Sequence, residues 1–296
     1  MKFILLKTAF RLLSLLPLRL LHGMGSGLGW LIYWASAQYS ARTRENLRMA
    51  GLASNEVEYR ELLHATIAET GKSFMELSWL WLRPYAEVLG KVHEFTGQAH
   101  ITSAQQRGKG IIFLTPHLGC FEICALYLAQ LKPLTVMYRP PKLLWLDEFM
   151  KRGRERGQIT LAKTDVSGVR LMVKALKRGE AIGLLPDQAP GAGEGEWADF
   201  FGRPAYTMTL LGRLAERSDA AVLMVYSRRL PQGQGYVINI EPLLLDLAAS
   251  VPRQVNAALE QTIRTSPSQY LWSYNRYKTP QGVHMPAQDS ARQDQA

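Results

Sequence analysis

The 296-residue sequence contains only two cysteines, Cys120 and Cys124. Four positions apart in a segment of helical pattern, they do not provide a disulfide framework, and they fit a reducing compartment. Between residues 50 and 280 the sequence also lacks a Pro/Gly/Ser tract, a block of like charge and an internal repeat. We therefore expect one domain over residues 42–282, preceded by a membrane anchor at 1–41 and followed by a flexible tail at 283–296.

Several common catalytic motifs are missing as well. The chain has no G-x-S-x-G elbow, no Walker A loop, no G-x-G-x-x-G after a strand and no H-E-x-x-H. These absences argue against the serine hydrolases with a nucleophile elbow, the P-loop enzymes, the dinucleotide-binding enzymes and the zinc proteases that carry these motifs. No nucleophile for a covalent intermediate is obvious.

The positive charge of the chain is unevenly distributed. Of the formal net charge of +10, the first fifty residues supply +6, from seven cations against the single acid Glu45: Lys2, Lys7, Arg11, Arg19, Arg42, Arg44 and Arg48. The other residues of this segment are mostly Leu, Ile, Phe, Trp and Gly, which nucleic-acid-binding arms rarely carry. A segment both basic and strongly apolar favours an anionic membrane surface as the partner and argues against nucleic acid.

No residue from Leu20 to Ala41 carries a formal charge, and about 20 residues are enough to cross a bilayer as a helix. Four glycines weaken that helix, and positive charge flanks both of its ends. A cleaved signal peptide is an alternative because Ala35-Ser36-Ala37 resembles a cleavage site, although Arg11 and Arg19 interrupt its apolar region. A buried helical hairpin is the third possibility. We expect a membrane-anchoring helix.

The remainder of the chain alternates between short apolar runs and longer segments of helical period. A long helix is expected over 54–82, and its apolar end, Trp79–Leu82, either is buried or contacts lipid. Strands are expected at 110–115, 134–138, 181–185, 221–227 and 236–240, with helices at 119–131, 143–156, 167–178, 207–217 and 251–265. This pattern predicts an α/β fold whose central, mostly parallel sheet is covered by helices on both faces.

In such sheets, chemistry gathers at the carboxyl ends of the strands. Three predicted loops begin there, at Pro116-His117, Arg139-Pro140 and Pro186-Asp187. His117-Leu-Gly-Cys-Phe-Glu122 is the most informative of them. A carboxylate at one imidazole nitrogen would fix the tautomer, so that the other nitrogen could take a proton from a hydroxyl. Because a five-residue offset inside one helix separates two side chains by about 140°, His117 must precede the helix for Glu122 to fold back onto it.

Two other interpretations of this segment remain open. A lone H-x4-E is often structural, and only its position after a buried strand favours catalysis. His117, Cys120 and Cys124 also have residue types and spacing that suit zinc, but no fourth ligand is apparent, and buried cysteines often act simply as small apolar side chains.

The loop that begins at Asp187 contains Gly191, Gly193 and Gly195 and continues to Phe200-Phe-Gly-Arg-Pro-Ala205. Glycines of this kind can cradle a phosphate, but two glutamates among them would repel it, so we expect a mobile lid. Arg139 and Arg203 are candidates to hold a phosphate or to polarise an acyl carbonyl, although either is equally well a solvated surface arginine.

Together these blocks resemble the bacterial lipid A biosynthesis acyltransferases, a branch of the lysophospholipid acyltransferase-like enzymes. The resemblance runs from the N-terminal segment to Lys278 and rests on four blocks: Thr115–Glu122, Met137-Tyr-Arg-Pro-Pro141, Leu185–Gln188 with Phe200–Ala205, and Gln269-Tyr-Leu-Trp272. It implies an α/β sandwich at the cytoplasmic face of the inner membrane. His117 becomes the general base and Glu122 its partner, while Arg139, Asp187 and Arg203 become candidates for substrate binding. Neutral Gln188 departs from relatives with a charged or imidazole residue there.

The resemblance further implies transfer of a fatty acyl chain from acyl carrier protein to a hydroxyl of a lipid A precursor. Because no nucleophile is obvious, we expect direct attack by the acceptor hydroxyl without an acyl-enzyme, and we expect no cofactor. The alternatives are acylation of another glycolipid or of a lysophospholipid, a zinc-dependent hydrolase using His117, Cys120 and Cys124, and a non-enzymatic membrane-binding protein.

Overall fold

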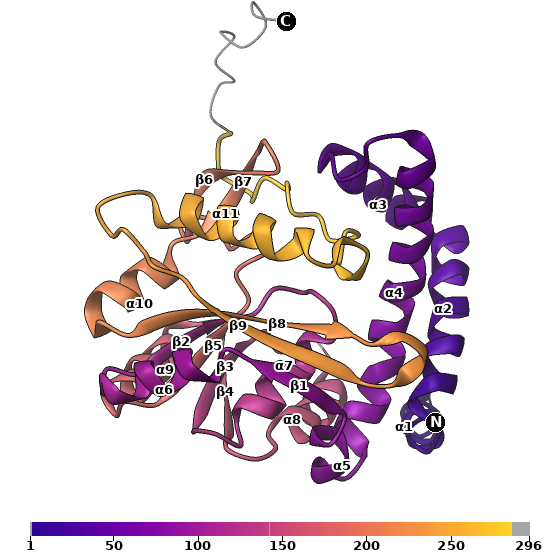
Figure 1. The fold of residues 1–296 in the computed structure, drawn as a ribbon, viewed down its shortest axis with the longest axis horizontal. Coiled ribbons are helices and arrows are strands. Elements are labelled where there is room, and N and C mark those ends of the chain that lie inside the picture. Colours follow the sequence, from indigo (N-terminus) through magenta and orange to yellow (C-terminus); the bar gives the residue numbers. More distant parts are fainter. Residues whose placement is uncertain (1, 142, 286–296) are drawn as a thin grey trace, which may run out of the picture.

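The computed structural model describes residues 2–141 and 143–285. Its centre is a seven-stranded sheet in the order β1-β9-β8-β2-β5-β3-β4 (Figure 1), in which every neighbouring pair is parallel except β8 and β9. The strands are β1 (Val92–Thr96), β2 (Ile111–Leu114), β3 (Leu134–Tyr138), β4 (Ile159–Lys163), β5 (Ala181–Leu184), β8 (Ala221–Arg229) and β9 (Tyr236–Pro242). The predicted mostly parallel sheet is confirmed.

Helices cover both faces of this sheet. They are α5 (Tyr85–Leu89), α6 (Gln98–Gln106), α7 (Phe121–Leu128), α8 (Leu144–Arg154), α9 (Val166–Lys177), α10 (Leu210–Ser218) and α11 (Val251–Arg264). Residues of β2 alternate between two cores: Ile112 and Leu114 pack in the core that includes α11, and Ile111 and Phe113 pack in the core that includes α7. The alternation follows from the two-residue period of a strand, and a strand buried on both faces reads as a continuous apolar run.

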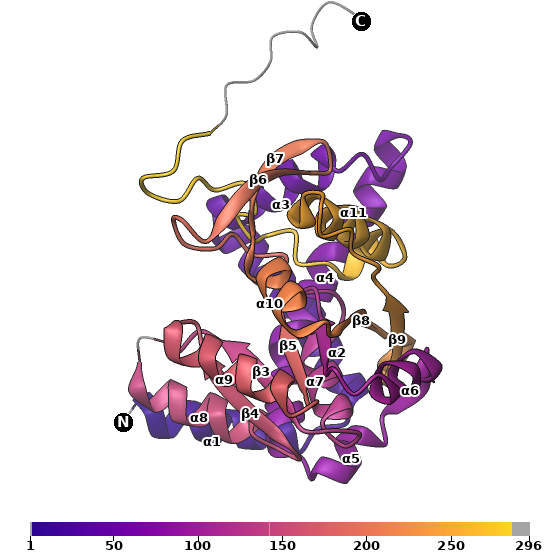
Figure 2. The ribbon, with the colours of Figure 1, turned by 90° about the vertical axis from the view of Figure 1, so that its left-hand side faces the viewer.

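The segment predicted as a lid is instead ordered as a hairpin of β6 (Gly195–Phe200) and β7 (Arg203–Met208). It lies beside α11, on the side of the sheet away from α8 (Figure 2). Asn256 of α11 donates to the backbone carbonyls of Ala198 and Asp199, and Tyr277 donates to the carbonyl of Phe200. These bonds satisfy backbone acceptors that a mobile loop would leave to water.

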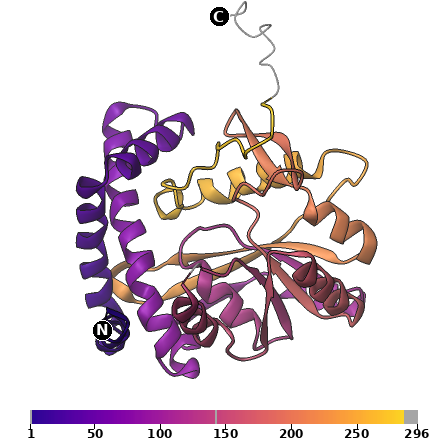
Figure 3. The ribbon, with the colours of Figure 1, turned by 180° about the vertical axis from the view of Figure 1, so that it is seen from behind.

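The N-terminal residues form α1 (Lys2–Ser14), α2 (Leu18–Ala35) and α3 (Ala37–Met49), followed by the long α4 (Glu56–Leu82). None of the helices described is long and apolar enough to cross a membrane. The predicted anchoring helix over residues 1–41 is therefore divided among α1, α2 and the start of α3, and α2 runs alongside α4 at one edge of the molecule (Figure 3).

Glycines explain how closely α2 packs against α4. A Cβ at Gly29 would lie 2.1 Å from the carbonyl oxygen of Ile67, and a Cβ at Gly71 would lie 1.9 Å from that of Gly25. The two backbones therefore touch at positions where any other residue would separate them. Two of the four glycines that weaken a membrane-spanning helix, Gly25 and Gly29, are thus those that bring α2 onto α4. The apolar end of α4 is buried as well, at Trp79, Leu80 and Trp81.

Candidate active site

Loops from neighbouring parallel strands meet at the carboxyl edge of the sheet. β2 pairs in parallel with β5, and the backbone N–H of Thr115 continues the ladder to the carbonyl of Leu184 at 2.9 Å. His117 follows β2 and Asp187 follows β5, so two residues seventy positions apart in the sequence become neighbours. This is the edge at which the sequence predicted chemistry.

Asp187 holds His117 through two hydrogen bonds. The imidazole Nδ1 of His117 lies 2.8 Å from Oδ1 of Asp187, and the backbone N–H of His117 donates to Oδ2, also at 2.8 Å. Because an ionised carboxylate only accepts hydrogen bonds, Nδ1 carries the proton and Nε2 is left as the acceptor. The side-chain nitrogen of Gln188 lies 3.2 Å from that Nε2, and the ring of Phe121 packs 4.6 Å from the imidazole, centroid to centroid.

The charge of Asp187 is maintained although its side chain is buried. Burial alone would raise the pKa of this carboxyl, but the positive charge available at His117 and the two hydrogen bonds from His117 outweigh it and lower the pKa below its usual value. A carboxylate that stays ionised beside an imidazole keeps the proton on Nδ1 and stabilises the imidazolium that forms when Nε2 takes a proton.

Glu122 does not contact His117 in the way that the sequence predicted. It lies in the first turn of α7, where Nε of Arg154 donates to both of its carboxylate oxygens at 3.0 Å and Arg154 Nη2 also bonds to Oε1. The indole N–H of Trp81 lies 3.4 Å from Oε2. The predicted partnership of Glu122 with His117 is therefore corrected: Asp187 orients the imidazole, and Glu122 pairs with Arg154.

His117, Glu122 and Arg154 line one cavity of about 950 Å³. Its wall includes apolar side chains from the face of the sheet and from the helices over it: Phe113, Leu134, Val136, Ile159 and Leu161 from strands, and Leu126, Leu128, Met150, Val169 and Val173 from helices. A cavity that combines many apolar side chains with charged groups is suited to a ligand that combines a hydrocarbon chain with a reactive polar end.

The three predicted substrate-binding residues are placed differently. Arg139, which follows β3, lines the cavity together with His117. Asp187 is buried behind His117. Arg203 begins β7, pairs with Glu45 at 3.4 Å and stacks on the ring of Tyr277 at 4.3 Å, and it is not among the cavity-lining residues. The structure therefore brings Arg139 and Asp187 to His117 and leaves Arg203 at the hairpin.

The two cysteines are buried on the core side of α7. Burial raises the pKa of the Cys124 thiol to about 12 and the pKa of Cys120 well above its usual value. Zinc binds the thiolate, which this environment disfavours. Within residues 2–141 and 143–285, no group of three or more His, Cys, Asp or Glu side chains is placed to hold a metal ion. Nothing in this geometry favours the zinc alternative.

Sequence reasoning missed two contributors to the site. Arg154 lies inside the predicted helix at 143–156 and is the last residue of α8, and no motif distinguishes it from the other cations there. Gln188 was noticed only as a departure from relatives, whereas its amide lies against the imidazole. The partnership of His117 with Asp187 had a detectable signal, since both residues follow apolar runs that were predicted to be strands of one sheet.

The chain is similar to known proteins over most of its length. The family model for bacterial lipid A biosynthesis acyltransferases matches residues 2–279. A lipid A biosynthesis lauroyltransferase of Escherichia coli is 30% identical over 90% of this chain and 89% of its own length. A lipid A biosynthesis palmitoleoyltransferase of the same organism is 25% identical over 89% of this chain and 87% of its own length. A Haemophilus influenzae lipid A biosynthesis acyltransferase is 27% identical over 90% of this chain and 85% of its own length. The chain belongs to the bacterial lipid A biosynthesis acyltransferase family.

Proposed function

We propose that this acyltransferase moves a fatty acyl chain from acyl carrier protein to a hydroxyl of a lipid A precursor, with His117 as the general base. One observation carries the proposal: His117, paired with the buried Asp187, lines a cavity with many apolar side chains, within a chain of this family. The pair supplies a base for a hydroxyl, and the cavity supplies space for a hydrocarbon chain.

In the proposed reaction, Nε2 of His117 takes the proton of the acceptor hydroxyl as its oxygen attacks the thioester carbonyl. The new C–O bond forms, the tetrahedral intermediate collapses with cleavage of the C–S bond, and the departing sulfur receives the proton from the imidazolium. Asp187 stays ionised throughout and stabilises the imidazolium. Gln188, which occupies Nε2 in the structure, gives way to the acceptor hydroxyl.

No residue of this chain needs to carry the acyl group. Cys120 and Cys124 are buried thiols whose raised pKa values disfavour the nucleophilic thiolate. The proposal is therefore a ternary complex, in which donor and acceptor are bound together before transfer.

The donor's hydrocarbon chain is proposed to lie along the apolar wall formed by β3, β4 and the helices over them. At the polar end, Arg154 is held by the Glu122 carboxylate and stacks near Trp81, with its guanidinium carbon 5.7 Å from the ring centroid. A cation fixed in a partly apolar cavity stabilises negative charge more strongly than one in water. We assign to Arg154 and Arg139 the stabilisation of the oxyanion or of a substrate phosphate, and to Glu122 the orientation of Arg154.

The lipid acceptor is proposed to approach from a membrane surface on which α2 lies. Leu20, Met24, Leu31 and Trp34 are 48–74% exposed and, at 100° per residue, fall within an arc of about 80° on one side of α2. From Leu20 to Trp34 this face is roughly 21 Å long, which is less than the ~30 Å hydrocarbon core of a bilayer. An apolar helix face beside basic residues suits an interfacial helix. We place the protein at the cytoplasmic face of the inner membrane, where acyl carrier protein is present.

The proposal is tested with purified full-length protein, acyl carrier protein loaded with a fatty acid and a lipid A precursor, with products identified by mass spectrometry. We expect one acyl chain to be added and His117→Gln to reduce turnover by about 100- to 10,000-fold, the usual contribution of a general base. The control is His100→Gln at an exposed position of α6. A clear preference for glycerol-based lysophospholipid acceptors, or near-normal turnover by His117→Gln, contradicts the proposal.

A further inference from the structure

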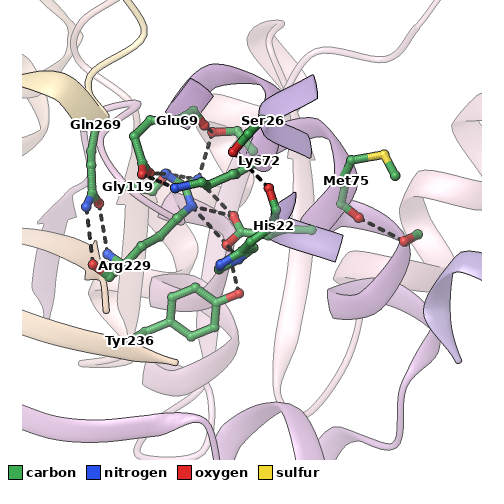
Figure 4. Close-up of polar contacts among 12 residues, drawn as sticks. His22, Ser26, Glu69, Lys72, Met75, Gly119, Arg229, Tyr236 and Gln269 are labelled. Carbon is green, nitrogen blue, oxygen red and sulfur yellow. Dashed lines mark hydrogen bonds and ion pairs between the residues drawn. The ribbon is translucent and has the colours of Figure 1, made fainter. Parts of the chain in front are cut away.

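A buried arginine, Arg229, lies directly behind the loop that carries His117 (Figure 4). It is the last residue of β8, and its guanidinium donates to the carbonyl oxygen of Gly119 at 2.8 Å and to Oγ of Ser73 at 2.7 Å. Nε of Arg229 lies 2.9 and 2.8 Å from the two carboxylate oxygens of Glu76. One side chain therefore ties the catalytic loop to α4, and the reactions proposed above do not use it.

The loop is also bound from its other side. Gly119 N–H donates to the carbonyl of Gln269 at 3.0 Å, and Leu271 N–H donates to the carbonyl of His117 at 3.1 Å. The side chain of Gln269 bonds in turn to the backbone of Arg229, accepting from its N–H at 2.8 Å and donating to its carbonyl at 3.2 Å (Figure 4). Gly119 and its neighbours are therefore held between the segment 269–271 and Arg229.

The conformation of Gly119 shows how closely the loop is confined. Its φ is +58°, a value that side-chain-bearing residues rarely adopt, and a Cβ there would lie 1.9 Å from the carbonyl oxygen of Ser227. A loop pressed this tightly against β8 has little freedom to move unless its hydrogen bonds open. Since His117 is only two residues away, the placement of its imidazole depends on the same bonds.

The charges around Arg229 are compensated within the buried cluster. Burial alone would raise the pKa of Glu76, but the charge of Arg229 and the hydrogen bond from His22 outweigh it and lower the pKa to about 2. The phenol of Tyr236 donates to the same carboxylate at 3.0 Å, and Glu69 lies 3.2 Å from Arg229 and 2.5 Å from Lys72. A buried ion pair of this kind adds little net stability compared with apolar packing, because both groups lose their hydration. We therefore infer that this ion pair fixes the geometry of the loop at Gly119.

We propose that Arg229 is a positioning residue for the reaction, which fixes the His117–Gly119 loop through the Gly119 carbonyl and couples it to α4. His22 of α2 joins the same cluster through Glu76, with its Nε2 2.7 Å from Oε1 (Figure 4). Hydrogen bonds thus connect the helix pair α2 and α4 to the carbonyl of Gly119, two residues along the backbone from His117. The kinetic part of this inference rests on the proposed acyl transfer, whereas the structural part does not.

The test compares Arg229→Lys with Arg228→Lys, the same substitution at the exposed neighbouring position of β8. A lysine at 229 keeps the charge opposite Glu76, so the fold is retained, but one ammonium lacks the planar fork that reaches Glu76, Ser73 and Gly119 together. In the acyl-transfer assay we expect kcat to fall by about 10- to 100-fold, the scale of a small displacement of a catalytic group, with the donor KM little changed. Arg228→Lys should match the wild type. An unchanged kcat in Arg229→Lys, or a loss confined to KM, overturns the proposal.

Amide hydrogen exchange in the detergent-solubilised full chain gives a second measurement that requires no substrate. We expect the amides of Gly119 and Leu271 to exchange faster in Arg229→Lys while the rest of the domain exchanges as in the wild type. Unchanged exchange at these two amides, or an equal acceleration across the whole domain, overturns the positioning role. If the wild type transfers no acyl group at all, the proposed function fails, and hydrogen exchange still decides whether Arg229 positions the loop.

Discussion

At the scale of single residues, the candidate site contains two carboxylates with separate partners. Asp187 is buried, ionised and bonded to Nδ1 of His117, whereas Glu122 is bonded to a guanidinium. An H-x4-E pattern invites a direct contact between its two ends, but here the contact to histidine comes from another strand. The sequence places the carboxylate of Glu122 near His117, but it does not show that Arg154 binds this carboxylate.

Asp187→Asn tests the orientation of the imidazole. An asparagine amide is nearly isosteric and can donate to Nδ1, which favours the tautomer with the proton on Nε2 and removes the base. We expect kcat to fall by about 100-fold or more, within the range of general-base contributions, with the fold retained. Asp199→Asn, an exposed position of the β6–β7 hairpin, is the control for the substitution itself. Full activity of Asp187→Asn in the transfer assay would show that Asp187 does not set the tautomer.

Glu122→Gln and Arg154→Lys test the second pair. The glutamine keeps the volume of the side chain but not the charge that holds Arg154, and the lysine keeps the charge but not the two-pronged contact. We expect each to lower kcat/KM by about 10- to 1,000-fold, the scale of losing a charge-stabilising group. Because the two residues act as one unit, the double variant should be little worse than either single one. If the loss of the double variant equals the sum of the two single losses in free energy, Glu122 and Arg154 act independently.

At the scale of elements, the sequence predicts the inner strands of the sheet well and its two edge strands poorly. The buried runs that became β2, β3, β5, β8 and β9 were all predicted as strands. β1 and β4 were missed because they are the two edge strands, short and partly exposed, with no continuous apolar run. The β6–β7 hairpin was missed because glycines and glutamates in it resemble a flexible loop, while the bonds that order it come from α11 and from the segment after it.

In the candidate site, too, the sequence predicts local positions but not long-range pairing. The strand-end position of His117 follows from local pattern, and so does that of Asp187, but their pairing depends on β2 and β5 being neighbours in a seven-stranded sheet. Sheet order is a long-range property that apolar periodicity does not encode. The N-terminal helix is predicted from its uncharged length, yet Gly25 and Gly29 are explained only by α4, whose contacting residues lie more than thirty positions later.

The exposed face of α2 carries a prediction about membrane binding. Leu31→Glu with Trp34→Glu should weaken binding to vesicles of phosphatidylethanolamine and phosphatidylglycerol by at least tenfold, because burying each large apolar side chain contributes about 1.5–3 kcal/mol. Vesicle sedimentation in low and high salt is the measurement. Leu244→Glu, at an exposed leucine outside the N-terminal helices, is the matched control. Equal sedimentation of the double variant and the control would mean that another surface binds the lipid.

The cavity wall carries a prediction about the length of the acyl chain. Gly183 of β5 lines the cavity, and a Cβ there would meet Val136 at 3.4 Å, an ordinary contact. Gly183→Ala should therefore be tolerated, and the larger Gly183→Val should fill part of the cavity. In competition assays with mixed acyl donors, we expect the valine variant, which adds three carbons, to reduce kcat/KM for the longest accepted chain relative to a shorter one by at least about 10- to 200-fold, the effect of a single methylene in an apolar pocket. An unchanged chain preference would place the acyl chain elsewhere.

At the scale of the whole molecule, the net charge of +10 favours the encounter with the proposed acidic donor protein. Acyl carrier proteins are small and acidic, so opposite fields speed the encounter, and the effect is screened when the Debye length shortens to about 10 Å at 0.1 M salt. We expect kcat/KM for the protein-borne donor to fall at least tenfold between 0.02 and 0.5 M salt, roughly the scale of electrostatic steering. A donor in which the same chain is carried on uncharged pantetheine is the control, because it has no net charge to steer. If kcat/KM depends equally on salt for both donors, the salt acts on the acceptor or the membrane. The basic surface then gives no support to a carrier-protein donor.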